Sequence, residues 1–363
     1  MSAAALASPA TSFADLDGPL TLESGAALPR VRVAYRTWGR LTPDGANAVL
    51  VCHALTGSAD VDTWWPGLLG PGRALDPDGD FVICSNILGS CYGTTGPTSA
   101  GPAGRPWGAD FPAISVRDMV GVQARLLDAL GVTYLKLVVG GSLGGMQALE
   151  WAAGHPSRVG AVAAIAVSGR HSPWCIGLSA AQRAAIRADA RFRDGRYPLD
   201  DPPADGLAAA RAIAMCTYRS PASFGRRFGR TVAAGGGEFE VERYLRHQGG
   251  KLVARFDANA FITLTRAMDT HDLARGRGGY EEALRRIDTP TLVVSIDTDV
   301  LYPPDEQREL ADLLPNAELV TLRSPHGHDA FLIEVARLDA IVRSFRRRVP
   351  SRSGARQGRG GAA

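Results

Sequence analysis

The stretch Val138-Val139-Gly140-Gly141-Ser142-Leu143-Gly144-Gly145-Met146 decides the fold of this chain. It carries the pattern G-x-S-x-G between an apolar strand and a helical segment, which we expect at Lys136–Gly140 and Leu143–Ala153. A serine on such a strand-to-helix turn needs neighbours without side chains, so that the turn can close and a substrate can approach. The following helix directs its first N–H groups at developing negative charge. This context favours a catalytic Ser142 over a glycine-rich packing turn.

Short apolar strands alternate with helical segments on both sides of this turn. The segment Ser115–Leu130, for example, has apolar residues at helical spacing. Strands that are almost entirely apolar are typical of a buried parallel sheet, and the alternation predicts a mostly parallel central sheet with helices on both faces. The expected strands are Leu20–Leu22, Arg30–Thr37, Ala48–His53, Phe81–Ser85, Lys136–Gly140, Ala161–Val167, Thr291–Ile296 and Glu318–Leu322.

The region from 170 to 286 differs from the rest, because it is rich in Ala and Arg and has helical patches but no clear strand. We predict a helical lid at 170–286 that covers the carboxyl edge of the sheet, inserted into a core domain formed by 1–169 and 287–349. The segment 350–363 is expected to be a disordered tail. The helical patches are Ala180–Ala190, Leu207–Tyr218, Ser223–Arg230, Val241–Gln248 and Ala258–Met268.

A catalytic serine needs a base, and the base needs an acid to orient it. The turn and the sheet together indicate the α/β-hydrolase fold, in which these partners follow in the order Ser, acid, His. Only His326 and His328 follow the last expected strand, and we favour His328 as the base. The acid should follow the strand Thr291–Ile296, where spacing alone leaves Asp297 and Asp299 open and either could instead be a turn-former.

Two backbone N–H groups should form an oxyanion hole for this serine. One belongs to Leu143, directly after the nucleophile. The other should come from the loop after the strand Ala48–His53, where we nominate the main chain of Leu55. His53 itself is expected to be structural or part of the site wall.

The bulk properties exclude several other classes of protein. The chain has 363 residues, a net charge of +3 and 45% hydrophobic residues, which is a globular composition without the basic stripe of a nucleic-acid binder. Its one basic cluster, Arg346–Arg348 followed by Arg352, Arg356 and Arg359, is interpreted as a solvated, disordered end. No window is apolar enough for a membrane span, and no secretory signal is expected. Five cysteines without a CxxC pair indicate reduced thiols in the cytoplasm and no zinc site.

From about Leu20 to Ile341 the chain resembles the homoserine O-acetyltransferase family. The motifs that carry this resemblance are together far more specific than G-x-S-x-G alone. They are Cys52-His53-Ala54-Leu55-Thr56-Gly57, Trp64-Trp65, Gly70-Pro71-Gly72-Arg73-Ala74-Leu75-Asp76, the run from Cys84 to Pro97, the extended turn Gly140 to Trp151, Thr217-Tyr218-Arg219-Ser220, Tyr244-Leu245-Arg246-His247-Gln248-Gly249 and Gly327-His328-Asp329-Ala330-Phe331-Leu332.

The resemblance implies a triad of Ser142, Asp299 and His328, because the family's acid lies in an Asp-x-Leu-Tyr/Phe stretch that residues 299–302 match. It also implies that Arg211 and Asp329 bind substrate. This assignment is chemically sensible, since a zwitterionic amino acid needs a cation for its carboxylate and an anion for its ammonium group.

The implied activity is transfer of an acetyl group from acetyl-CoA to L-homoserine through an acetyl-serine enzyme, as a step of methionine biosynthesis. The resemblance further implies a cytoplasmic homodimer with contacts from the lid helices and no cofactor or metal; no nucleic-acid or membrane partner is expected. The nearest alternatives are a serine O-acyltransferase and a homoserine O-succinyltransferase. An esterase or other hydrolase, or a non-catalytic binding protein on the same scaffold, are further alternatives.

Overall fold

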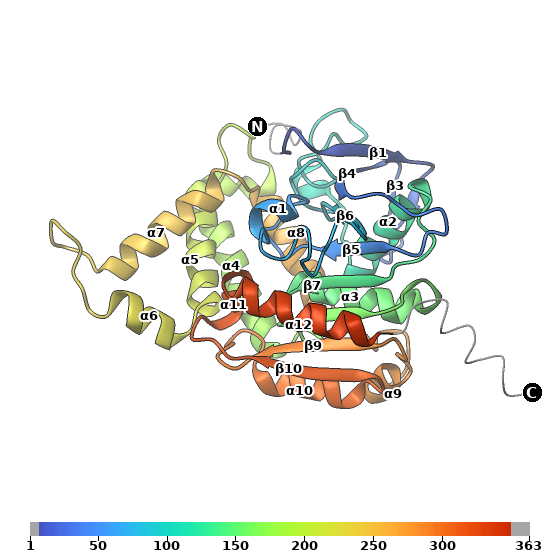
Figure 1. The fold of residues 1–363 in the computed structure, drawn as a ribbon. Coiled ribbons are helices and arrows are strands. Elements are labelled where there is room, and N and C mark those ends of the chain that lie inside the picture. The colour runs from blue at the N-terminus through green and yellow to red at the C-terminus, as the bar shows by residue number, and fades with distance from the viewer. Residues whose placement is uncertain (1–6, 350–363) are drawn as a thin grey trace, which may run out of the picture.

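The computed structural model describes residues 7–349 and contains an eight-stranded sheet with the order β1-β4-β6-β5-β7-β8-β9-β10 (Figure 1). Strands β5 to β10 run parallel to their neighbours in this group, whereas β4 pairs antiparallel with β1 and β6. Strands β2 and β3 form a separate antiparallel pair. The bounds are β1 Ser12–Leu16, β2 Leu20–Thr21, β3 Ala27–Leu28, β4 Val31–Trp38, β5 Ala48–Cys52, β6 Phe81–Ser85, β7 Leu137–Gly141, β8 Val162–Ile165, β9 Thr291–Ile296 and β10 Ala317–Leu322.

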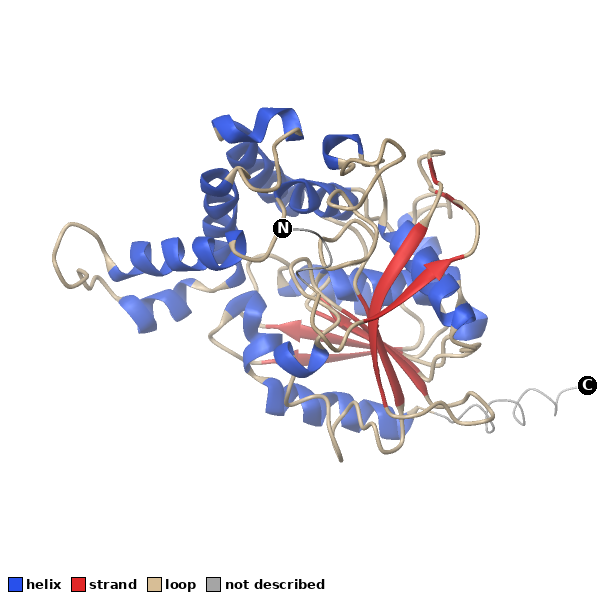
Figure 2. Ribbon diagram, turned by 90° about the horizontal axis from the view of Figure 1, so that it is seen from above, coloured by secondary structure: helices blue, strands red, loops and turns tan. Residues whose placement is uncertain are grey.

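Two apolar layers hold helices against the opposite faces of the sheet (Figure 2). Successive side chains of β5 point to opposite faces, so Val49 and Val51 pack with α1 and α12, whereas Leu50 and Cys52 pack with α2, α3 and α10. The helices are α1 Val61–Trp64, α2 Val116–Ala129, α3 Leu143–Gly154, α4 Pro173–Ala188, α5 Ala204–Tyr218, α6 Pro221–Phe228, α7 Glu240–Val253, α8 Ala258–Asp269, α9 Tyr280–Arg285, α10 Pro304–Leu313, α11 Ala330–Ile333 and α12 Val335–Arg348, with 3-10 turns η2 Gly108–Asp110, η3 Pro156–Arg158, η4 Ala190–Gly195 and η5 Gly327–Asp329.

Helices α4 to α9 lie between β8 and β9 in the chain, where the helical insertion was expected. Helix α5 packs against α4 and α7, and α6 and α7 project away from the sheet on the left of Figure 1. Helix α8 is more deeply embedded, since Phe261 and Leu264 belong to the apolar layer of the sheet. The division into a core of 1–169 and 287–349 and a lid at 170–286 stays a prediction, and the expected tail at 350–363 lies outside the described residues.

The expected α/β-hydrolase architecture is confirmed, with three local differences. The strand expected at Leu20–Leu22 pairs only with β3 and does not join the main sheet. Strand β1 was not expected, because only Leu16 of its five residues is buried and an edge strand needs little apolar sequence. Helix α4 begins earlier than expected, with Ser172 accepting a hydrogen bond from the backbone N–H of Cys175 as its N-cap.

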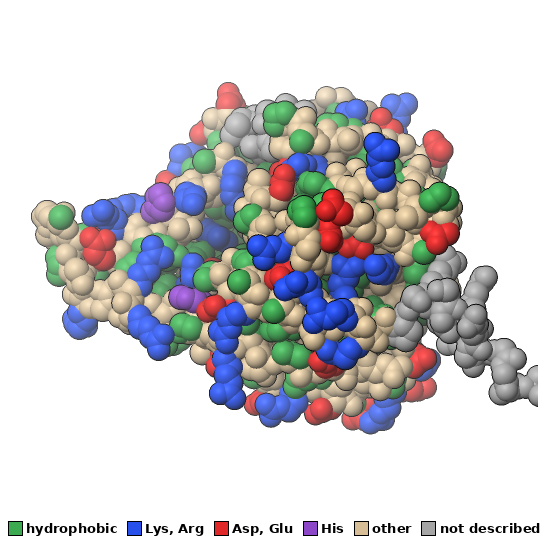
Figure 3. All heavy atoms as spheres, viewed as in Figure 1, with side chains coloured by type: hydrophobic (Ala, Val, Ile, Leu, Met, Phe, Trp, Pro, Cys, Tyr) green, Lys and Arg blue, Asp and Glu red, His purple; other side chains and the backbone are tan. Residues whose placement is uncertain are grey.

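The interpretation of Arg346–Arg348 as part of a disordered end is wrong, although Arg347 and Arg348 are exposed to solvent as expected. The three further arginines of the cluster lie outside the described residues. Arg346–Arg348 form the last turn of α12, and Arg346 makes two hydrogen bonds of 2.7 and 2.8 Å with the buried carboxylate of Asp80. Composition could not reveal a partner 266 residues away. On the face shown in Figure 3, basic and acidic side chains are interspersed. Among residues 7–349, no helix combines the length and the apolarity that crossing a bilayer takes.

Candidate active site

The backbone of Ser142 has the strained conformation expected of a nucleophile on a tight turn. Its φ of 57° and ψ of −125° lie in a left-handed region that costs an L-residue about 1–3 kcal/mol. The Ser142 N–H donates to Ile165 O at 2.9 Å, and the serine stands between the end of β7 and the first residue of α3. The surrounding fold therefore holds Ser142 at the carboxyl edge of the sheet.

The glycines of this turn are required by close backbone approach. A Cβ at Gly140 or Gly144 would collide with the carbonyl oxygen of Cys52, at the end of the neighbouring strand β5. A Cβ at Gly141 would meet the ring of Phe331 at 2.7–3.0 Å. The absence of side chains lets β5, the turn and the segment after His328 approach one another.

His328 and Asp299 form a buried hydrogen-bonded pair. The imidazole Nδ1 lies 2.8 Å from Asp299 Oδ2, and both side chains are at most 4% exposed. The other carboxylate oxygen, Oδ1, accepts from the backbone N–H groups of Leu301 at 2.9 Å and Tyr302 at 3.0 Å. These bonds leave Asp299 oriented to accept the Nδ1–H of His328, which would leave Nε2 free to act as a base.

Asp297 and His326, the alternative candidates for the acid and the base, contact other groups. Asp297 is exposed and accepts from the backbone N–H of Ser324 at 2.8 Å. His326 lies 3.4 Å from the hydroxyl of Ser223 through its Nδ1. Neither joins the pair described above.

Three aromatic rings surround the imidazole of His328. The ring centroids of Tyr302, Phe331 and Tyr218 lie 5.4, 5.6 and 5.8 Å from it. Burial lowers the pKa of His328, but the charge of Asp299 and the hydrogen bond to it outweigh this effect, so the pKa is raised above its ordinary value. Because Phe331 also contacts Gly141, it connects the imidazole to the turn that carries Ser142.

The turn that carries His328 is held by backbone contacts with α5 and with the loop after β9. Gly327 has a φ of 69° and packs so closely on the backbone of Arg219 and Ser220 that a side chain could not fit. The hydroxyl of Thr298 accepts from the Gly327 N–H at 3.0 Å and donates to Ser324 O at 2.6 Å. These contacts fix the backbone immediately before the imidazole.

Leu55 and Leu143 bring two backbone N–H groups to the same edge of the sheet. Leu143 is the first residue of α3, so its N–H has no acceptor within the helix. The loop of Leu55 is closed by a hydrogen bond from Gly57 N–H to Ala54 O at 2.9 Å. Within residues 7–349 no hydrogen-bond acceptor is found for the Leu55 N–H. Neither N–H has a hydrogen-bond acceptor among the described residues, and their role as an oxyanion hole stays a prediction.

His53 lies in the core beneath this loop and stabilises it through hydrogen bonds. It is fully buried, its Nδ1 lies 2.8 Å from Ala54 O, and its Nε2 accepts from the Ile87 N–H at 3.2 Å. Burial lowers the pKa of His53 to about 4, so the ring is neutral. His53 therefore has the structural role that was one of the two expected for it.

Arg255, in the segment before α8, also holds this loop in place. The Nη1 of Arg255 donates to Thr56 O at 2.7 Å and to the hydroxyl of Tyr92 at 2.5 Å. Arg255 lies 199 residues from Thr56 in sequence, so no local pattern could have revealed the contact.

Arg211 and Asp329 lie on adjoining elements near His328. The Arg211 guanidinium stacks on the ring of Tyr218, with its Cζ 5.3 Å from the ring centroid, and Tyr218 in turn packs on His328. Among the described residues Arg211 makes no ion pair, although its charge acts on the nearby carboxylate of Asp329. An unpaired cation beside the imidazole suits the carboxylate of an amino acid.

Asp329 has a partner that the sequence did not predict. Its Oδ2 lies 3.2 Å from the Nε of Arg219, at the carboxyl end of α5. Burial raises the pKa of Asp329, and Arg219, His328 and Arg211 oppose this increase. Arg219 belongs to Thr217-Tyr218-Arg219-Ser220, one of the motifs that carry the family resemblance. The resemblance by itself gave Arg219 no role.

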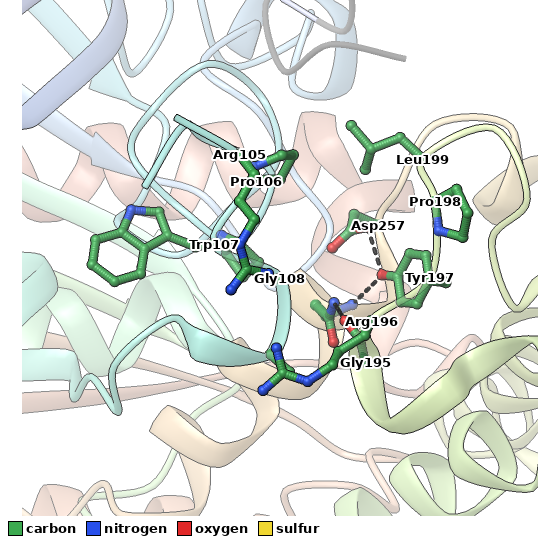
Figure 4. Close-up of a pocket in the computed structure, with 13 residues that line it drawn as sticks. Arg105, Pro106, Trp107, Gly108, Gly195, Arg196, Tyr197, Pro198, Leu199 and Asp257 are labelled. Atoms are coloured by element: carbon green, nitrogen blue, oxygen red, sulfur yellow. Dashed lines mark hydrogen bonds between the residues drawn. The ribbon is translucent and has the colours of Figure 1, made fainter. Parts of the chain in front are cut away.

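The structure also has a pocket of about 230 Å³ (Figure 4). Its wall includes Trp107, Arg196, Tyr197 and Asp257, and none of the predicted site residues. The Tyr197 hydroxyl donates to Asp257 at 2.6 Å and accepts from the Asn259 N–H at 2.9 Å, so these polar groups already have partners. Among residues 7–349 no cluster of His, Cys, Asp and Glu could hold a metal ion.

Comparisons with known proteins agree with this geometry. A family model described as the alpha/beta hydrolase fold matches residues 47–335. A homoserine O-acetyltransferase of Chlorobium chlorochromatii is 57% identical over 344 residues, which cover 94% of this chain and 96% of that protein. The crystal structure of a homoserine O-acetyltransferase from Bacillus anthracis has a TM-score of 0.86 at 25% identity, covering 95% of this chain and 100% of that one. The acetyl esterase MekB has a TM-score of 0.83 at 29% identity, covering 93% and 96%.

Proposed function

Because the chain belongs to the homoserine O-acetyltransferase family of the α/β hydrolases, we propose that it transfers an acetyl group from acetyl-CoA to the hydroxyl of L-homoserine, as a step of methionine biosynthesis. The observation that carries this proposal is the buried His328–Asp299 pair, connected through Phe331 to the strained turn of Ser142. The 57% identity to a homoserine O-acetyltransferase supports the proposal, because acyl transfer needs an activated nucleophile of this kind.

The first half-reaction acetylates the enzyme. His328 Nε2 takes the proton of the Ser142 hydroxyl, and Oγ attacks the carbonyl carbon of the thioester. The negative charge that develops on the carbonyl oxygen is bound by the N–H groups of Leu55 and Leu143. The C–S bond then breaks, the imidazolium returns its proton to the sulfur, and CoA leaves as a thiol. Asp299 stabilises the imidazolium without becoming protonated.

The second half-reaction transfers the acetyl group to the amino acid. Arg211 binds the carboxylate of homoserine and Asp329 binds its ammonium group, which directs the hydroxyl at the acetyl-serine. His328 removes the hydroxyl proton, the hydroxyl oxygen attacks the ester carbonyl, and the proton passes to Ser142 Oγ as it leaves. The segment 170–286 acts as the lid that excludes water from this intermediate. No metal or prosthetic group takes part, and the enzyme acts as a cytoplasmic homodimer that contacts its partner through the lid helices.

The proposed function is tested by following thiol release from acetyl-CoA with and without L-homoserine, with O-acetylhomoserine identified by mass spectrometry. Release that depends on homoserine supports transfer. Equal release without an acceptor would identify a hydrolase, and no release would favour a binding protein. Replacing acetyl-CoA by succinyl-CoA, and homoserine by serine, tests the two nearest alternatives directly.

An esterase is the second candidate, because the acetyl esterase MekB shares this fold over almost the whole chain. A hydrolase and a transferase can use the same nucleophile, base and oxyanion hole. They differ in whether water or a bound acceptor reaches the acyl-serine first. Arg211, a cation that makes no ion pair among the described residues, favours the transferase, because a simple acetyl ester offers it no carboxylate.

We expect Arg211→Ala to raise the KM for homoserine about 10- to 100-fold, because a charge-assisted hydrogen-bonding partner of the carboxylate is lost. Acetyl-enzyme formation from acetyl-CoA alone should be unchanged. The matched control is Arg230→Ala, which removes another lid arginine that stacks on an aromatic ring, at 5.5 Å from Phe239. An unchanged homoserine KM in Arg211→Ala would place the carboxylate site elsewhere.

A further inference from the structure

The side chain of Gln147 connects the two backbone segments that carry Leu55 and Leu143. Its Nε2 donates to His53 O at 3.3 Å and to Leu143 O at 3.1 Å. His53 begins the loop of Leu55, two residues before the nominated N–H. Gln147 lies one helical turn after Leu143 and is fully buried. One amide group therefore joins the start of the loop to the first turn of α3.

The orientation of this amide is set by a chain of buried hydrogen bonds. The indole N–H of Trp151 donates to Gln123 Oε1 at 2.8 Å, and an indole can only donate. Gln123 must then present its Nε2 to Gln147 Oε1, at 2.7 Å. Gln147 must in turn present its NH₂ group to the two carbonyl groups, with one hydrogen for each.

The two segments joined by Gln147 are also in direct backbone contact. A Cβ at Gly144 would collide with Cys52 O and would lie 3.2 Å from His53 O. The absence of a side chain at Gly144 allows this close approach, but it does not prevent one segment from shifting along the other. A side chain that makes directional hydrogen bonds to both segments does prevent this shift.

We propose that Gln147 is a positioning residue of the oxyanion hole, which sets the separation and aim of the Leu55 and Leu143 N–H groups. The proposal rests on the proposed function, since it assigns a purpose to the same site. Donors in such a site must lie 2.7–3.1 Å from the oxyanion, so a small displacement of either segment weakens both bonds in the transition state. Substrate binding through Arg211 and Asp329 does not involve this bridge.

The test is Gln147→Met, which roughly preserves side-chain volume and removes both donors. We expect kcat for acetyl transfer to fall about 10- to 100-fold, less than the 10²–10³ lost when a donor is removed outright, with the KM for homoserine unchanged. A trifluoromethyl ketone analogue of the acetyl thioester forms a tetrahedral oxyanion adduct with a catalytic serine. Its affinity should fall by a similar factor, whereas the Kd of the product CoA should not change.

The matched control is Asn259→Leu, since Asn259 is a buried amide that donates to Gly195 O at 2.8 Å, beside the pocket of Figure 4. Both variants should lower the Tm, but only Gln147→Met should lose kcat and ketone affinity. Wild-type kcat and ketone affinity in a folded Gln147→Met would overturn the proposal, as would equal losses in Asn259→Leu. If the unmodified enzyme itself released no thiol from acetyl-CoA with homoserine, the proposed function would fail instead.

Discussion

Ser142→Ala is expected to lower kcat for homoserine acetylation by at least about 10⁴-fold, because the covalent route through an acetyl-serine is removed. The fold should survive, since the hydroxyl makes no hydrogen bond to another described residue and the close contacts of this turn's backbone are made at Gly140, Gly141 and Gly144. Thiol release from acetyl-CoA, followed over hours, measures the residual rate. Alanine is also no worse suited to this φ than serine.

Circular dichroism and Tm serve as the control for folding of Ser142→Ala. The variant should still bind CoA and homoserine, because neither ligand needs the hydroxyl. A folded variant that retains more than about a tenth of wild-type kcat would rule out Ser142 as the nucleophile, since no loss that small fits removal of a covalent intermediate.

Asp299→Asn is expected to lower kcat about 10³- to 10⁴-fold, because an amide would present its NH₂ group to Nδ1 and favour the wrong tautomer of His328. It should also change the pH dependence of kcat/KM for acetyl-CoA. His328 acts as a base only when neutral, so activity is present above its pKa and is lost as the pH falls through it. Asp299 raises the pKa of His328 above its ordinary value in the wild type, so the acid limb lies at higher pH than it would for a free imidazole.

In Asp299→Asn the larger of the two charges that raise the pKa of His328 is absent, whereas burial, which lowers it, and the smaller effect of Asp329 remain. The acid limb of the residual activity should therefore move to lower pH. Asp297→Asn provides the matched control, since Asp297 is exposed and bonds to Ser324 rather than to the imidazole. A large loss in Asp297→Asn together with a small one in Asp299→Asn would reverse the assignment of the acid.

The strand, turn and helix around Ser142 could be predicted because their signals are local. An apolar run, four glycines and a helical repeat occupy adjacent positions, and the observed β7 and α3 differ from the expected bounds by one residue. Strand β1 could not be predicted in this way, because it pairs along the exposed edge of β4 and buries only Leu16. The order of the last turn of α12 could not be predicted from composition, because Asp80, which binds Arg346, is distant in sequence.

The same distinction applies to the site. Spacing alone could not separate Asp297 from Asp299, because both follow β9, and the structure shows that only Asp299 contacts the imidazole. The resemblance directed attention to Asp299 through its neighbours, but it gave no role to Gln147 or Arg219. Their contacts join segments far apart in the chain, and a hydrogen-bond network of that kind leaves no periodic pattern to read.

Acyl transfer through Ser142 can be tested most directly by trapping the acetyl group on the enzyme. The protein is mixed with acetyl-CoA alone, quenched within the first turnover and digested, and the acetylated peptide is sequenced by mass spectrometry. One acetyl group is expected on Ser142, and it should disappear on addition of homoserine as O-acetylhomoserine forms. An acetyl group on another residue, or product formation at full rate without any acetylated enzyme, would contradict transfer through Ser142.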